Sequence, residues 1–172
     1  MMLGAVLAGG ESRRFGSDKA LALLDGQTLL ARAIERLRVC DELVVAGRDV
    51  PGITSLADWP APGLGPLGGL AAAMRHLRRA GCAHLVSLPV DVEGLPDDWL
   101  ERLFIGGTGS VCAMGQPLVG VWAVRDWPRL EGFIEGGGRR VRDWVRQCQA
   151  LEIDLGPLIN INTRDDLAGL GG

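Results

Sequence analysis

The sequence is poor in the residue types that build metal clusters and disulfide frameworks. It has only two histidines, His76 and His84, and four cysteines scattered through 172 residues without a C-x-x-C pair. This spacing is typical of reduced, partly buried thiols, and it argues against both a metal cluster and a disulfide framework. No apolar run approaches the ~20 residues of a transmembrane helix, and no basic segment precedes the first apolar run. We therefore expect a cytoplasmic protein with no membrane partner.

An excess of basic charge is also absent. The 18 Lys and Arg residues against 21 Asp and Glu give a net charge of −3, which argues against broad nucleic-acid binding. A hydrophobic content of 47% and a charged content of 23% are ordinary for a globular protein. No repeat, low-complexity tract or long linker divides the chain. Residues 1–172 are therefore predicted to form one domain around a single core.

Apolar runs with strand character alternate with segments of helical periodicity. The predicted strands are 3–6, 43–46, 53–57, 83–88, 110–114, 118–124 and 151–155. The predicted helices are 29–37, 67–77, 100–104, 127–134, 141–148 and 167–170, with Asp97 or Asp98, Asp126 and Thr163 as caps. This alternation predicts an α/β fold with a mostly parallel sheet flanked by helices. The two successive strands around residues 115–117 predict at least one antiparallel member.

The most informative stretch directly follows the first predicted strand. Residues 7–19 read LAGGESRRFGSDK, with three glycines, two arginines and a lysine. Glycine lets backbone N–H groups approach a ligand, and Arg and Lys supply donors and charge for phosphate. The spacing fits neither the P-loop nor the dinucleotide fingerprint. The stretch is therefore predicted to be a different kind of phosphate-binding loop, with a solvated surface loop as the alternative.

A literal G-x-G-x-x-G occurs later, at residues 63–68. Four residues, two of them prolines, separate it from Asp58, whereas a dinucleotide-binding loop directly follows its strand. We interpret the motif instead as the start of the helix over 67–77. Such a helix N-terminus offers free N–H groups and a positive dipole end to an anion or a polar ring.

Three features follow the carboxyl ends of predicted strands and so lie at one edge of the predicted sheet: the loop over 7–19, Asp58 and Asp91. Ligands of open α/β sheets bind at this edge. A phosphate-binding loop that faces carboxylates is typical of Mg²⁺-assisted phosphoryl or nucleotidyl transfer. Arg14 and Lys19 are the predicted phosphate ligands, Asp91 is the predicted Mg²⁺ ligand, and Asp18 is a candidate for orienting Lys19. Turn or cap roles for the aspartates stay open as alternatives.

The pattern L-A-G-G-x-S-x-R-x-G-x-D-K over residues 7–19 resembles the signature loop of nucleotidyltransferases, most closely the molybdenum cofactor guanylyltransferases. The resemblance covers most of the chain. It includes Asp58 followed by Gly-Pro-Leu-Gly-Gly-Leu at 65–70, Pro-Val-Asp at 89–91, Gln-Pro-Leu at 116–118 and Asn-Ile-Asn-Thr at 160–163. It implies a three-layer Rossmann-like nucleotidyltransferase fold with a mixed, mostly parallel sheet.

The resemblance also implies an activity: transfer of GMP from GTP to molybdopterin, with or without molybdenum, releasing pyrophosphate and forming the guanine dinucleotide. Mg²⁺ is the implied cofactor, and no protein nucleophile is needed because the pterin phosphate attacks the α-phosphorus directly. GTP and molybdopterin are the implied substrates, and molybdenum-insertion proteins and molybdoenzyme chaperones are candidate partners.

The family match assigns roles to individual residues. The guanine and ribose are implied to contact Leu7, Ala8, Gly9 and Gly10. Lys19 is implied to contact phosphate, Asp58 to contact the nucleotide, and Asp91 to hold Mg²⁺. Arg139 and Arg140 match a basic pair in the family and are candidates for contacting the acceptor phosphate, with a solvated helix start as the alternative. Asn160 and Asn162 are implied to lie on the pterin side.

Two departures from the family pattern are visible. Val-Ala-Gly-Arg at 45–48 stands where the family often has an asparagine-bearing segment, and Val-Asp-Val at 90–92 replaces Cys-Asp-Thr.

The alternative activities are cytidylyl or other nucleotidyl transfer to molybdopterin or another phosphorylated acceptor, and nucleotide binding without catalysis. The Gly9-Gly10 pair favours guanylyl transfer. The joint presence of Gly16, Lys19 and Asp91 argues against a non-catalytic binder.

Overall fold

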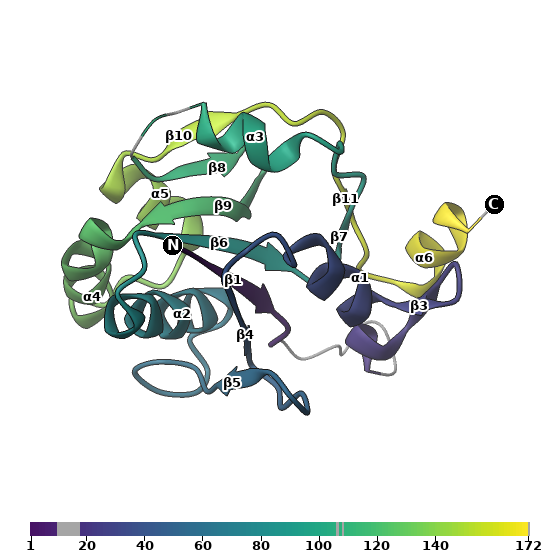
Figure 1. The fold of residues 1–172 in the computed structure, drawn as a ribbon, viewed down its shortest axis with the longest axis horizontal. Coiled ribbons are helices and arrows are strands. Elements are labelled where there is room, and N and C mark those ends of the chain that lie inside the picture. The colour runs from purple at the N-terminus through teal and green to yellow at the C-terminus, as the bar shows by residue number, and fades with distance from the viewer. Residues whose placement is uncertain (10–17, 106, 108, 172) are drawn as a thin grey trace.

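A mixed β-sheet forms the centre of the computed structural model, which describes residues 1–9, 18–105, 107 and 109–171 (Figure 1). Its seven described strands, in spatial order, are β10 (Leu151–Ile153), β8 (Val111–Ala113), β9 (Gln116–Ala123), β6 (His84–Pro89), β1 (Met2–Leu7), β4 (Glu42–Ala46) and β5 (Thr54–Leu56). Only β9 runs antiparallel to its neighbours, β6 and β8. The predicted α/β fold, with a mostly parallel sheet and an antiparallel member, is confirmed.

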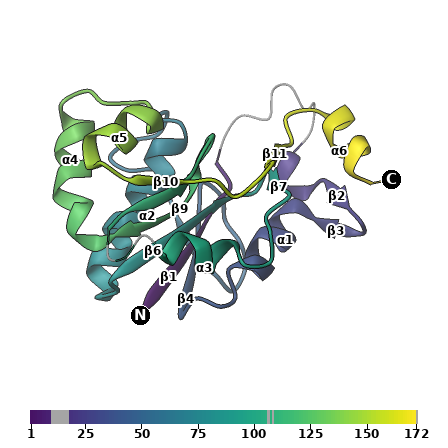
Figure 2. The same ribbon diagram turned by 90° about the horizontal axis from the view of Figure 1, so that it is seen from above.

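Helices cover both faces of this sheet, so the molecule has three layers (Figure 2). On one face lie α2 (Pro66–Ala80), α4 (Trp127–Glu135) and α5 (Val141–Cys148); on the other lie α1 (Leu29–Arg36) and α3 (Trp99–Phe104). Side chains of β1 alternate between them: Leu3 and Ala5 pack in the α2 layer, and Val6 packs in the α1 layer. Because both faces are covered, β1 is a nearly continuous apolar run.

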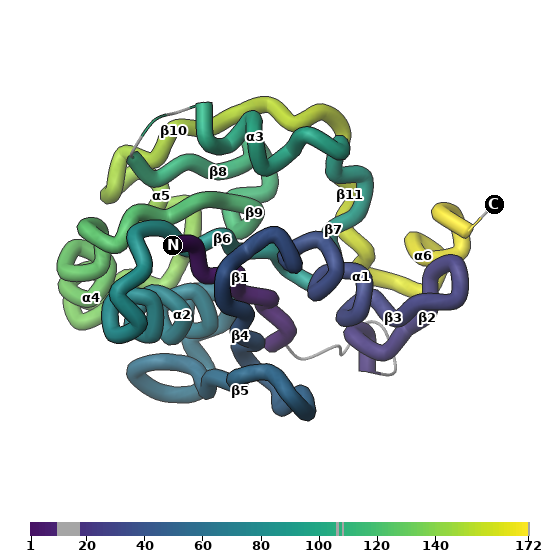
Figure 3. The backbone as a smooth tube through the Cα atoms, viewed as in Figure 1, coloured from purple at the N-terminus to yellow at the C-terminus, as the bar shows by residue number. Residues whose placement is uncertain are grey.

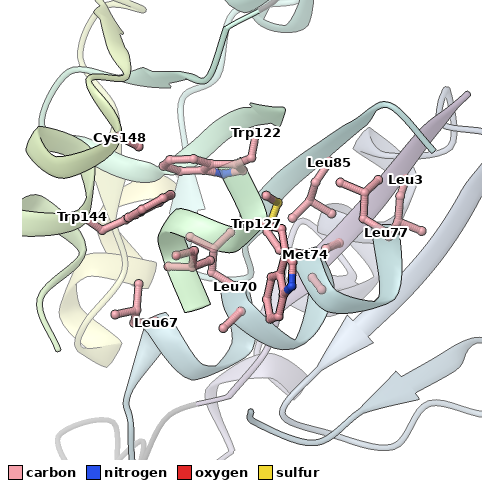
Figure 4. Packing of buried hydrophobic residues seen from close by; sticks show 14 of the residues in the cluster. Leu3, Leu67, Leu70, Met74, Leu77, Leu85, Trp122, Trp127, Trp144 and Cys148 are labelled. Atoms are coloured by element: carbon pink, nitrogen blue, oxygen red, sulfur yellow. The ribbon is translucent and has the colours of Figure 1, made fainter. Parts of the chain in front are cut away.

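The core beneath α2 is built around three fully buried tryptophans (Figure 4). Trp122 from β9, Trp127 from α4 and Trp144 from α5 pack with the apolar stripe of α2, which includes Leu70 and Met74. The described part of α2 begins at Pro66, with Gly65 in the N-cap position at φ +62°. The predicted helix start within residues 63–68 is therefore confirmed.

A smaller lobe projects from one end of the sheet (Figure 3). It consists of the hairpin β2 (Leu23–Leu24) and β3 (Gln27–Thr28) together with α6 (Arg164–Leu170), which share a small apolar cluster. The predicted capping box of α6 is confirmed by reciprocal bonds between Thr163 and Asp166. Nearby, β7 (Val92–Glu93) pairs antiparallel with β11 (Ile159–Asn160), which brings the C-terminal segment beside the chain that leaves β6.

Two predicted caps do not form as side-chain bonds. Asp126 precedes α4, but its carboxylate accepts a hydrogen bond from Ser110 Oγ at 2.6 Å instead of capping the helix. Asp98 precedes α3 and binds Arg102 at 2.9 Å. The four cysteines are free, and they are more deeply buried than the partly buried thiols expected; burial raises the pKa of Cys112 to about 12. Among the described residues, no helix has the length and apolar character needed to cross a membrane.

Candidate active site

The carboxyl ends of the central strands open into a cavity of about 800 Å³. Leu7, at the end of β1, lies in register with Ala46 of β4 on one side and Pro89 of β6 on the other, and all three line the cavity. Gly65 and Pro66 at the N-terminus of α2 form another part of the wall. Three strand ends and one helix start therefore meet around a single space, where ligands of open α/β sheets bind.

Lys19 and Asp91 make direct contact in this cavity, although 72 positions separate them. Lys19 Nζ donates to Asp91 Oδ2 at 2.8 Å and to the backbone carbonyl of Ile161 at 3.0 Å. The side chains are 17% and 23% exposed, so the pair is partly shielded but still open to the cavity. Ile161 N also donates to the backbone carbonyl of Asp91 at 2.8 Å. The C-terminal segment thus holds both partners of the ion pair.

The chain immediately after Asp91 is anchored by a buried ion cluster. The carboxylate of Glu93 accepts from Arg32 Nε at 2.8 Å, Arg32 Nη2 at 3.1 Å and Arg36 Nη2 at 3.1 Å. Burial pushes the pKa of Glu93 upward, but the hydrogen bond from Arg32 and the charge of Arg36 outweigh it and lower the pKa. This cluster ties β7 to α1, two residues from the carboxylate of Asp91.

Asp58 faces the cavity from the segment that joins β5 to α2. Its position is fixed by its neighbour Trp59, which packs on Trp127 with ring centroids 5.1 Å apart and donates its backbone N–H to Gly68 O at 3.2 Å. Burial raises the pKa of Asp58 above its usual value. A partly desolvated carboxylate at the cavity wall is suited to accept hydrogen bonds from a ligand.

Asp18 has a different set of partners from the one predicted. Its Oδ1 accepts from Ala20 N at 3.2 Å and so caps the 3₁₀ turn η1 (Lys19–Leu21), while its Oδ2 pairs with Arg48 Nη2. The hydrogen bond from Arg48 is the main cause of the lowered pKa of Asp18. Asp18 therefore acts on Lys19 through the backbone of the turn.

The structure brings most predicted site residues together. Leu7, Ala8, Gly9, Lys19, Asp58 and Asp91 all line the same cavity. Asn160 lies beside Asp91: with its amide nitrogen toward Asp91, that nitrogen is 3.2 Å from the backbone oxygen and 3.3 Å from Oδ2. Gly10 and Arg14 lie outside the described residues. The roles assigned to these residues stay predictions.

The remaining predicted acceptor residues are not among those described as lining the cavity. Arg139 and Arg140 are exposed between α4 and α5, and Arg139 Nη1 donates to the backbone oxygens of Ile134 at 2.9 Å and Gly138 at 2.7 Å. Asn162 is exposed, and its backbone N–H donates to Asp166 Oδ2 at 2.8 Å. Their assignment to the acceptor also stays a prediction.

Sequence reasoning did not identify the contributions of Ile161, Glu93 and Arg48. The first is a backbone contact, and the other two depend on strand and loop neighbours that are distant in the chain. One available signal would have strengthened the case for Lys19: of the 18 Lys and Arg residues, it is the only lysine. A compact ammonium group on a flexible stem is not interchangeable with a planar guanidinium.

Comparison with known proteins gives a consistent result. The family described as the MobA-like NTP transferase domain matches residues 4–151. A molybdenum cofactor guanylyltransferase of Rhodobacter capsulatus is 31% identical, over 96% of this chain and 92% of its own. A protein of the same name from Sinorhizobium fredii is 36% identical, over 94% of this chain and 87% of its own.

Two solved structures are similar in fold. Molybdopterin-guanine dinucleotide biosynthesis protein A from Archaeoglobus fulgidus superimposes with a TM-score of 0.79 at 23% identity, covering 99% of this chain and 97% of its own. The 2-C-methyl-D-erythritol 4-phosphate cytidylyltransferase of Thermus thermophilus gives a TM-score of 0.73 at 14% identity, covering 97% and 96%. The same three-layer arrangement therefore occurs in proteins named for different nucleotides.

Proposed function

Because this chain belongs to the MobA-like NTP transferase family, we propose that it is a molybdenum cofactor guanylyltransferase. The reaction is transfer of GMP from GTP to molybdopterin, with or without molybdenum. An oxygen of the pterin phosphate forms a bond to the α-phosphorus of GTP, and the bond from that phosphorus to the β-phosphate oxygen breaks. Pyrophosphate leaves, and molybdopterin guanine dinucleotide is the product.

The observation that carries this proposal is the 2.8 Å contact between Lys19 and Asp91 at the wall of the strand-end cavity. Transfer to a phosphate nucleophile needs positioning and charge neutralisation more than covalent help from the protein. Lys19 supplies a positive charge for the triphosphate, and Asp58 and Asp91 supply carboxylates in the same cavity. When substrate binds, the ammonium group of Lys19 is expected to exchange its carboxylate partner, Asp91, for a negatively charged phosphate oxygen of the nucleotide.

Mg²⁺ is part of the proposal, with Asp91 as its protein ligand. Mg²⁺ commonly uses one or two carboxylates and takes its other oxygens from substrate phosphates and water. The carboxylate of Asp91, which lines the cavity, fits this requirement. Bound there, the ion would neutralise charge that develops on the phosphates.

The acceptor is proposed to lie toward the C-terminal segment. Asn160 adjoins Asp91, and its strand β11 pairs with β7, which directly follows Asp91 in the chain. Arg139 and Arg140 are the proposed contacts for the pterin phosphate because both are exposed cations. On this basis, replacing Arg140 with alanine should raise the KM for molybdopterin and leave the affinity for GTP unchanged.

The direct test is to incubate the purified protein with molybdopterin, MgCl₂ and either GTP, CTP or ATP. Pyrophosphate release and chromatography of the pterin product are followed together. Formation of the guanine dinucleotide from GTP alone is the expected result. Formation of a cytosine dinucleotide from CTP instead would assign the chain to cytidylyl transfer, and absence of any product would refute the proposed transferase activity.

Lys19→Ala and Lys19→Arg separate charge from geometry in the same assay. The alanine variant should lose GTP affinity by at least about tenfold, because it removes a charge-assisted hydrogen bond. The arginine variant keeps the charge but cannot place a compact ammonium group between Asp91 and Ile161 O. An unchanged GTP affinity in both variants would reject the phosphate contact.

A further inference from the structure

Two neighbouring residues after β4, Gly47 and Arg48, contact the predicted phosphate-binding loop over 7–19 at two positions, Gly9 and Asp18. Gly47 has φ +88° and lies against Gly9: a Cβ at position 47 would come within 2.3 Å of Gly9 Cα and 2.5 Å of Gly9 N. The next residue, Arg48, binds Asp18 through its guanidinium group. Positions 9 and 18 are therefore each held by one member of the dipeptide Gly47-Arg48.

The contact at Arg48 leads directly to Lys19. Asp18 uses one carboxylate oxygen for Arg48 Nη2 and the other for Ala20 N, so the same side chain joins Arg48 to the backbone of η1. Lys19 is the first residue of that turn, and its ammonium group reaches Asp91 and Ile161 O. A shift of Asp18 would therefore move the origin of the Lys19 side chain.

The burial of Arg48 does not suggest a role in overall stability. Its side chain is 22% exposed, that of Asp18 is 44% exposed, and ion pairs this open to water contribute little to folding. Arg48 Nη1 is buried and has no hydrogen-bond partner within the described ranges. A guanidinium that is partly desolvated and incompletely paired is unfavourable for folding, which favours a reason other than stability for keeping it there.

We propose that Arg48 is a positioning residue of the transferase: through Asp18 it fixes the η1 turn and so directs Lys19 toward the phosphates of the nucleotide. The inference rests on the proposed function for its consequence in catalysis, but its geometric part stands on the ligand-free protein. It also gives a role to Arg48 within the segment 45–48. Here the side chain at position 48 acts on the phosphate-binding lysine from outside the cavity wall.

The single lysine makes this proposal measurable without any nucleotide. An amine-selective reagent modifies only Lys19 and the N-terminal amine, and mass spectrometry of the peptides separates the two. In the wild-type protein, burial and the contact with Asp91 should make modification of Lys19 slow. In Arg48→Ala the rate should rise several-fold, and the KM for GTP should rise by about tenfold, as for the loss of one charge-assisted hydrogen bond.

Three further variants make the test specific. Asp18→Asn keeps an oxygen for the cap at Ala20 but loses the charge that pairs with Arg48, so it should match Arg48→Ala, and the double variant should be no worse than either. Arg48→Lys should keep part of the wild-type protection of Lys19, with the added lysine quantified on its own peptide, and it is the reference if Arg48→Ala folds poorly. Arg38→Ala, whose side chain is 69% exposed and paired with Glu35, is the control and should behave as the wild type.

The positioning role would be overturned if the rate of Lys19 modification were unchanged in folded Arg48→Ala. It would also be overturned if the double variant showed the product of the two single-variant effects. A purely stabilising Arg48 would lower the unfolding midpoint and leave the labelling rate of the folded protein at the wild-type value. If the wild-type protein converts no nucleotide, the proposed function fails. The labelling rates would still decide whether Arg48 positions Lys19.

Discussion

Glu93→Gln should destabilise the protein through the ion cluster that supports the Asp91 loop. The substitution keeps the size of the side chain and removes its charge, leaving Arg32 and Arg36 without their shared carboxylate. Removing one partner of a buried ion pair costs about 3–5 kcal/mol. The side chains of Arg32 and Arg36 are 21% and 27% exposed, so water can solvate the unpaired guanidinium groups in part. We therefore expect a loss near the lower limit, about 3 kcal/mol.

The pH dependence gives this prediction a second part. Because the pKa of Glu93 is lower in the folded protein than in the unfolded chain, its contribution is complete above the usual glutamate value of 4.5 and is lost as the pH falls through the folded pKa. The difference in unfolding free energy between wild type and Glu93→Gln should therefore be largest near neutral pH and shrink in acid.

Urea unfolding followed by tryptophan fluorescence measures this difference at each pH. For a chain of this length, a loss of about 3 kcal/mol corresponds to a midpoint about 6–12 °C lower in a thermal scan. Glu35→Gln is the matched control because Glu35 is 63% exposed and pairs with the similarly exposed Arg38; it should cost less than about 0.5 kcal/mol. A loss of less than about 1 kcal/mol for Glu93→Gln, or a difference independent of pH, would refute the reasoning.

Three other substitutions test the site and the core. Asp91→Asn should retain the fold but lower pyrophosphate release by at least about a hundredfold, and wild-type turnover would contradict the metal role. Gly47→Ala should cost about 2 kcal/mol because of its close approach to Gly9, whereas Gly52→Ala, at a similar φ of +80° but with no atom within 4 Å, should cost clearly less in the same urea titration. Leu70→Ala should lower the unfolding free energy by about 2–5 kcal/mol, since Leu70 is fully buried beneath the sheet; a change below this range in urea titrations would mean that the core collapses around the gap.

The sequence predicted the elements whose signals are local. The alternating apolar runs located the central strands, and the predicted cap at Thr163 located the start of α6. Parallel strands place their carboxyl ends at one edge of the sheet, so the sequence alone predicts that Lys19 and Asp91 face the same cavity.

The elements that escaped prediction depend on partners distant in the chain. β7 and β11 have two residues each, too few for a periodic pattern, and they exist because each supplies the other's backbone partners. Asp126 has the position of a helix cap, but its carboxylate accepts a hydrogen bond from Ser110 instead of from a backbone N–H of α4. Arg48 lies in a connection, and only the three-dimensional approach of Asp18 shows its use. A single sequence does not contain these distances.

The contact between Lys19 and the carbonyl of Ile161 has a consequence for how the protein is made. Position 161 is synthesised 142 residues after position 19. A nascent or prematurely terminated chain can therefore assemble the central sheet while its lysine still lacks its final carbonyl partner. The affinity of such a product for nucleotide would report whether the tail completes a working cavity or only covers one that is already formed.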